Sequence, residues 1–128
     1  MLTGCGAREL LDLKLTAFFA SRQCPGAAIR AAMDWALQQA RAKRAVVSGF
    51  HSPLEQSASK VLMAAVNPVV VVSGVATVSR LTQKLATERN ALVAQLAHKI
   101  VVAHASPAGS LAAQLHQWRL DGRQVELL

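Results

Sequence analysis

Residues 13–26 read Leu13-Lys14-Leu15-Thr16-Ala17-Phe18-Phe19-Ala20-Ser21-Arg22-Gln23-Cys24-Pro25-Gly26, and this stretch decides the fold. It begins as an apolar run of 13–20 with β-branched and aromatic members, which predicts a buried strand. A polar turn and a Pro-Gly turn signal follow at once. Ile29, Met33 and Leu37 then recur every fourth residue, which predicts a helix over 26–43 with these three side chains facing inward. Strand, short turn and helix is how an open α/β domain builds a ligand crevice.

The rest of the chain repeats this alternation. Further strands are predicted over 45–48, 69–72, 99–104 and 123–128. Further helices are predicted over 53–65, over 78–97 and around Leu111, Leu115 and Trp118, with a turn of helix at 9–11. Short connections and right-handed crossovers then predict one domain over 1–128, with a three-layer α/β/α architecture and a five-stranded parallel sheet of order 3-2-1-4-5. In that sheet 69–72 is expected to be covered on both faces, and Trp35 and Trp118 are expected in the core.

Composition and charge narrow the function classes. The 128 residues carry a formal charge of +7, which favours anionic partners. No apolar run approaches the ~20 residues of a membrane span, and charged residues interrupt any signal peptide near the N-terminus. A cytoplasmic protein without a membrane interaction is therefore predicted. Cys24 has two open interpretations: a small turn residue, or a thiol whose pKa is lowered by the nearby Arg22 and a helix N-terminus.

Three turns, 21–26, 49–53 and 105–110, are expected to meet at the carboxyl edge of the sheet. They contribute hydroxyls, small residues and one guanidinium, with almost no carboxylate. This composition suits the binding of a phosphate or a sugar. The candidate ligand-binding residues are Ser21, Arg22, Gly26, Gly49, His51, Ser52, Gly109 and Ser110.

Other positions near this edge have competing interpretations. Phe50 could stack on a base. Arg89 and Asn90 lie in the middle of a predicted helix and are also candidates for ligand binding, the alternative being a charged face with a local cap. Glu55 could be a general base or a ribose contact, or could simply complement the helix dipole. No carboxylate completes a triad with His51 and Ser52, so no catalytic residue is assigned.

No metal or cofactor is expected either. His98, His104 and His116 have no shared metal-ligand spacing, and the two cysteines have none.

Four short motifs resemble the Rossmann-like domain of the DNA-processing protein A (DprA/Smf) family, and they occur in the family's order. They are Phe18–Gly26, Val46–Glu55, Glu88–Ala97 and Ala108–Leu111. The wider superfamily also contains the cytokinin-activating phosphoribohydrolases. The resemblance implies a phosphate- or nucleotide-binding crevice and, for the DprA family itself, binding of single-stranded DNA and a role in recombination.

Three functions are consistent with these observations. The first is a binding module for a nucleotide, a phosphosugar or single-stranded DNA. The second is a nucleotide-processing enzyme that cleaves an N-glycosidic bond, in which Glu55 would act. The third is an oligomeric ligand-binding protein whose terminal strand, Val125–Leu128, contributes to the interface.

Overall fold

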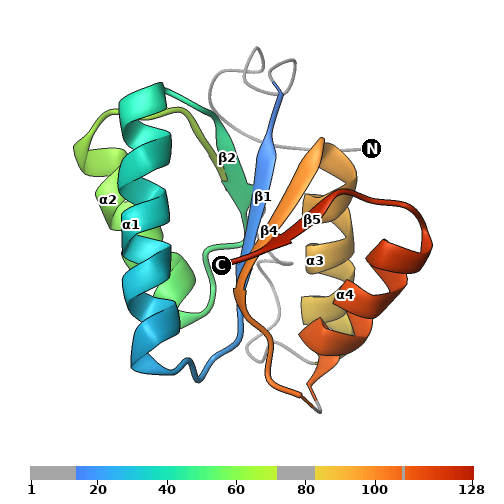
Figure 1. Cartoon of the computed structure of the whole chain (residues 1–128). Coiled ribbons are helices and arrows are strands. Elements are labelled where there is room, and N and C mark those ends of the chain that lie inside the picture. The colour runs from blue at the N-terminus through green and yellow to red at the C-terminus, as the bar shows by residue number, and fades with distance from the viewer. Residues whose placement is uncertain (1–13, 72–82, 108) are drawn as a thin grey trace.

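The structure, a computed structural model, describes residues 14–71, 83–107 and 109–128. Within these residues the chain alternates strictly between strands and helices (Figure 1). The strands are β1 (Thr16–Ala20), β2 (Val46–Ser48), β3 (Val69–Val71), β4 (Lys99–His104) and β5 (Val125–Leu127). The helices are α1 (Gly26–Ala42), α2 (Pro53–Ala64), α3 (Gln83–Leu96) and α4 (Ser110–Leu120).

The five strands form one parallel sheet in the order β3-β2-β1-β4-β5, as predicted. β1 is central and pairs with β2 on one side and β4 on the other, with Ala17 opposite Val47 and Ile100. Parallel neighbours end at the same edge of a sheet. The turns that follow β1, β2 and β4 are therefore brought together.

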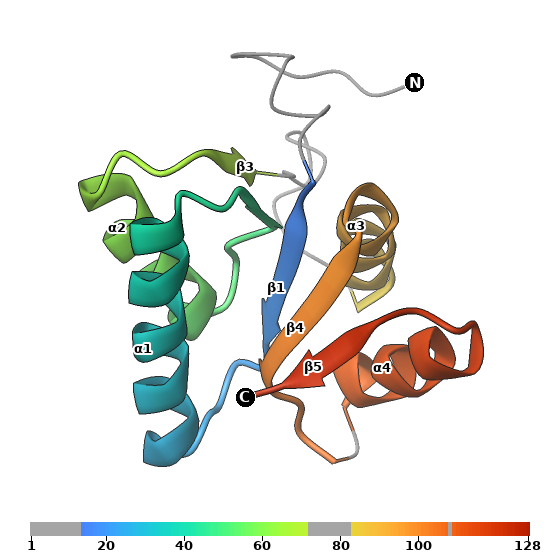
Figure 2. The same cartoon turned by 45° about the horizontal axis from the view of Figure 1, so that its top comes forward.

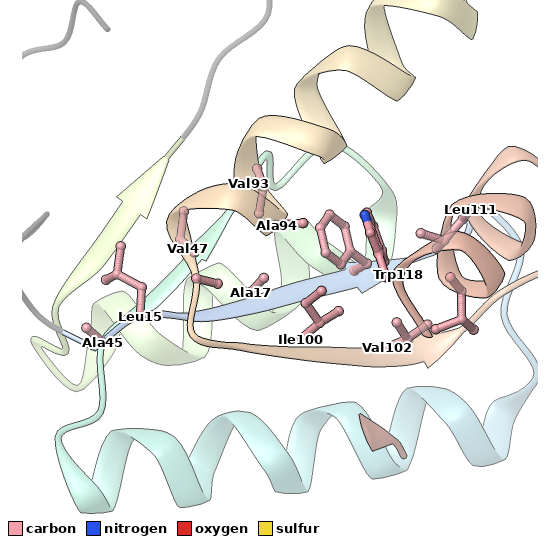
Figure 3. Packing of buried hydrophobic residues seen from close by; sticks show 13 residues of the cluster. Leu15, Ala17, Ala45, Val47, Val93, Ala94, Ile100, Val102, Leu111 and Trp118 are labelled. Carbon is pink, nitrogen blue, oxygen red and sulfur yellow. The ribbon is translucent and has the colours of Figure 1, made fainter. Parts of the chain in front are cut away.

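Helices cover both faces of the sheet, which gives the predicted three layers. In Figures 1 and 2, α1 and α2 lie on one side and α3 and α4 on the other. On the α1/α2 side, Phe18 of β1 stacks on Trp35 with ring centroids 4.8 Å apart. On the α3/α4 side, Phe19 stacks on Trp118 with ring centroids 4.9 Å apart. Figure 3 shows Trp118 among the buried residues on this side. Successive residues of β1 thus fill opposite cores, and both tryptophans are buried as predicted.

The inward face of α1 differs from the prediction. Ile29 and Leu37 are each 44% exposed, and Met33 is half-buried. The buried face consists mainly of small residues: Ala28, Ala32, Trp35, Ala36, Gln39 and Ala40. Alanines let the helix backbone approach the sheet closely, and the one large side chain on this face, Trp35, fills the remaining space.

Some strand boundaries and the burial of some side chains also differ from the predictions. β1 begins at Thr16, so Lys14 and Leu15 precede the strand, although Leu15 is buried. β3 is an edge strand whose Val71 is 50% exposed, so it is not covered on both faces. The predicted turn of helix at 9–11 and the segment 72–82 lie outside the described residues. None of the described helices is long and apolar enough to cross a membrane.

Candidate functional site

The turns after β1 and β4 are joined by direct hydrogen bonds at the carboxyl edge of the sheet. The backbone N–H of Ser21 donates to the carbonyl of His104 at 2.9 Å. The N–H of Ser106 donates to the hydroxyl of Ser21 at 2.8 Å, and the N–H of Gly109 donates to the carbonyl of Ser106 at 2.9 Å. Ser21 and Gly109 therefore belong to one rim. We call the turns 21–26, 49–53 and 105–110 the carboxyl rim.

Glu55 connects the turn after β2, residues 49–53, to β1. Its Oε2 accepts the N–H of Ala20 at 3.0 Å. Its Oε1 accepts the N–H of His51 at 2.9 Å and that of Ser52 at 3.3 Å. Because both oxygens already accept backbone N–H groups, this carboxylate holds the start of α2 against the end of β1.

The start of α2 is closed by a capping box. The Ser52 hydroxyl accepts the N–H of Glu55 at 3.3 Å, and the Glu55 carboxylate in turn accepts the N–H of Ser52. Burial raises the pKa of Glu55, and it outweighs the three backbone N–H groups and the Arg89 charge, which lower it. The side-chain oxygens of the two predicted site residues Ser52 and Glu55 thus accept hydrogen bonds from backbone N–H groups of this protein.

Arg89 is a buried cation at this rim. It extends from α3 and is only 9% exposed. Its Nε is buried and has no hydrogen-bond partner among the described residues. Burial lowers the pKa of the guanidinium, whereas the negative charge of Glu55 raises it. An unpartnered N–H on a buried guanidinium is energetically unfavourable.

Gly49 makes room for Arg89. A Cβ at position 49 would overlap the Arg89 Nε and lie 2.8 Å from its Cδ. Any side chain at this position would therefore have to displace the guanidinium. The sequence made Gly49 a candidate ligand-binding residue, but the group that lies against it in the structure is a side chain of this protein.

Phe50 follows in a left-handed conformation, with φ of 47°. Its N–H donates to the hydroxyl of the fully buried Ser48 at 3.0 Å. Its ring is buried among α1, α2 and the sheet. The expectation that Phe50 stacks on a base is therefore wrong, because the ring anchors the turn. Ser48, which holds the turn after β2, was not predicted, since a buried serine carries no distinctive sequence signal. Ser106 lies in the predicted rim turn 105–110 and bonds to Ser21 there.

Two helix N-termini at the rim remain without side-chain caps. α1 begins at Gly26 after Pro25, and α4 begins at Ser110 after Gly109; neither start has a side-chain cap hydrogen bond. Neither first turn contains an acidic residue. Such starts offer backbone N–H groups and a positive dipole end to an anion. Arg22 lies exposed in the turn before α1.

The remaining candidates occupy different environments. His51 is exposed at the start of α2. Asn90 contacts the side chain of Gln114 at 3.4 Å, which ties α3 to α4. Cys24 is half-buried, and its thiol donates to the carbonyl of Ser21 at 3.2 Å. Burial raises the pKa of this thiol, and Glu55 adds to the effect, so the interpretation of a lowered pKa is wrong.

Comparison with known proteins places this geometry in a structural context. No protein-family model matches the sequence, and no curated protein matches it. Among solved structures, DNA processing protein A from Streptococcus pneumoniae has a TM-score of 0.74 and 16% identity, covering 93% of this chain and 51% of that protein. DNA processing protein A from Helicobacter pylori, described for its single-stranded DNA binding mode, has a TM-score of 0.74 and 15% identity. The match covers 95% of this chain and 68% of that protein.

The chain therefore spans about half the length of the first of these proteins and about two thirds of the second. At this level of identity the comparison concerns the fold alone, and it extends over 93% and 95% of this chain. The described chain has the Rossmann-like fold of the DNA processing protein A structures.

Proposed function

We propose that this protein binds single-stranded DNA through its sugar–phosphate backbone at the carboxyl rim. The observation that carries the proposal is Arg89, a buried guanidinium whose Nε has no partner among the described residues. A phosphate is the complementary ligand, because it accepts charge-assisted hydrogen bonds from a guanidinium.

Three further features support a polymer of phosphates. The uncapped starts of α1 and α4 are suited to anions, and the exposed Arg22 lies beside the first of them. The formal charge of +7 favours a polyanion. A protein of the same fold, DNA processing protein A of H. pylori, has a single-stranded DNA binding mode. A role in DNA uptake or recombination is the corresponding biological proposal.

The test is a titration of a fluorescent thymidine oligonucleotide, followed by anisotropy over a series of salt concentrations. Arg22→Ala should weaken binding and reduce the slope of log K against log salt by about one. Arg119→Ala is the matched control, because Arg119 is exposed in the last turn of α4, away from the rim. Absence of binding at low salt, or equal effects of the two substitutions, would exclude this function.

Self-association is a second part of the proposal. Leu120, Leu127 and Leu128 are 67%, 51% and 37% exposed at or near β5, an edge strand of the sheet. An apolar edge strand readily pairs with another chain. Leu127→Lys should convert a dimer to a monomer in light scattering; a parent chain that is monomeric at high concentration would exclude the interface.

A further inference from the structure

A hollow of about 610 Å³ lies at the opposite, amino-terminal edge of the sheet from the carboxyl rim. It is bordered by the C-terminal half of α1 and by residues at the starts of β1, β2, β4 and β5. We call it the amino-edge hollow. Its lining residues used below are Lys14, Trp35, Gln39, Arg44, His98 and Lys99.

The sheet surface in this hollow carries Thr16, Lys99 and Glu126 beside the apolar Val101. Ile100, Val102 and Val125 pack into the α3/α4 core, so the alternate residues of β4 and β5 face the α1 side. Those residues include Lys99 and Glu126, which form an ion pair at 2.9 Å. Such a surface is not one that an apolar helix would cover, and it favours a polar ligand.

The charge of the hollow is strongly positive. Four lysine or arginine side chains line it, against one carboxylate, that of Glu126. Lys99 neutralises Glu126, and Lys43 donates to the carbonyl of Ala65 at 3.1 Å. Lys14 and Arg44 are exposed and have no ion-pair partner among the described residues.

The dipole of α1 accounts for only part of this charge. Lys43 and Arg44 follow the helix C-terminus directly, where cations are favourable. Lys14, His98 and Lys99 precede or begin β1 and β4, and thus belong to other elements. Their convergence on one hollow has no explanation in helix capping.

Gln39 adds an uncharged polar side chain to the lining of the hollow. It is 5% exposed and lines the hollow. Its backbone carbonyl accepts the N–H of Arg44 at 3.1 Å, which ties the end of α1 to the turn before β2. The side-chain amide has both donors and an acceptor, so it suits a polar ligand in the hollow.

We propose that the amino-edge hollow binds a phosphorylated ligand of nucleotide size, either a free nucleotide or one unit of a polynucleotide. Lys14 and Arg44 would contact the phosphate, and the Gln39 amide would bond to the rest of the ligand. Trp35 supplies an apolar wall, and the volume lies in the range of small-molecule sites. The site is distinct from the carboxyl rim and does not depend on DNA binding there.

The test is a ¹H–¹⁵N NMR titration of the whole chain with inorganic pyrophosphate, thymidine monophosphate and a thymidine oligonucleotide. The hollow is reported by the signals of Gln39, Ala45 and His98, and the rim by those of Ser21 and Gly49. The Lys14→Ser/Arg44→Ser variant should weaken the response of the hollow roughly tenfold or more, while the rim response is retained. Lys60→Ser/Arg119→Ser is the control of equal charge, since both residues are exposed and neither lines the hollow.

Each outcome has a defined meaning. Saturable shifts at the hollow that the Lys14/Arg44 variant weakens, and that the control retains, support the proposal. Among these, a response to the monophosphate identifies a free nucleotide, and a response to the oligonucleotide alone identifies a polymer. No shift at the hollow with any of the three probes, or equal weakening in variant and control, would overturn it. Rim shifts without hollow shifts would leave the DNA-binding function intact and reject this second site.

Discussion

Gly49 and Arg89 are in such close contact that the guanidinium occupies the space of a Cβ at position 49. The two residues come from the end of β2 and from α3, so this contact joins two elements across the carboxyl rim. The contact fixes the position of the buried positive charge of Arg89. Any ligand that uses Arg89 depends on the absence of a side chain at Gly49.

Gly49→Ala is therefore expected to displace Arg89 and to weaken oligonucleotide binding. The overlap is with a flexible side chain rather than with backbone, so the loss of unfolding free energy should be small, about 1 kcal/mol. A double-mutant cycle with Arg89→Met, read by urea unfolding and by anisotropy, should give a coupling energy of roughly 0.5–3 kcal/mol. Gly26→Ala is the control for the unfolding measurement alone, because a Cβ there would meet nothing within 4 Å. Additive effects of the two substitutions would contradict the direct contact.

Ser52→Ala is expected to destabilise the protein by about 1 kcal/mol, because it removes the acceptor for the N–H of Glu55. Chemical denaturation measures this change. Ser57→Ala provides the comparison within α2: Ser57 is exposed and its hydroxyl only donates to the carbonyl of Pro53, so its loss should stay within about 0.5 kcal/mol. If both substitutions cost the same, the capping box contributes no special stability.

The raised pKa of Glu55 predicts a pH dependence of stability. A carboxyl whose pKa is higher in the folded state binds its proton more tightly there than in the unfolded chain. Its stabilising contribution is therefore complete below the unfolded pKa and is lost as pH rises through the folded pKa. The unfolding free energy of the parent should fall relative to that of Glu55→Gln as pH increases from about 4.

Arg89→Met should shift this fall to higher pH, because the Arg89 charge lowers the pKa of Glu55. Urea unfolding at a series of pH values, with ¹³C NMR of the Glu55 carboxyl, measures both effects. A parent that gains stability relative to Glu55→Gln over this range would show that the N–H donors and Arg89 outweigh burial.

The order of the strands could be predicted from sequence because local signals mark the alternating strands and helices. Short connections and right-handed crossovers then limit the possible orders. The inward face of α1 could not. Ile29 and Leu37 have the greater hydrophobicity, but the close approach of α1 to the sheet requires the smaller Ala32 and Ala36. Hydrophobic periodicity does not describe this steric requirement, which depends on the neighbouring surface.

The candidate site was predictable as a set of turns rather than as a set of contacts. Ser21 and Gly49 could be assigned to one edge, since parallel strands end together. The contact between Gly49 and Arg89 depends on how α3 crosses the sheet, which no local pattern specifies. The amino-edge hollow was missed because its cations, such as Lys14 and Lys99, are far apart in sequence and precede strands, where ligand sites are not expected.

Cys24 is expected to react slowly with iodoacetamide near neutral pH. Burial and the Glu55 charge both raise the pKa of the thiol, so the reactive thiolate is scarce. In a Cys5→Ser background, the alkylation rate should lie below that of a short cysteine peptide, and Glu55→Gln should increase it. Unfolding the chain in urea should restore the ordinary rate, which controls for local sequence effects. A folded protein that reacts faster than the peptide would show that Arg22 and the start of α1 control the thiol after all.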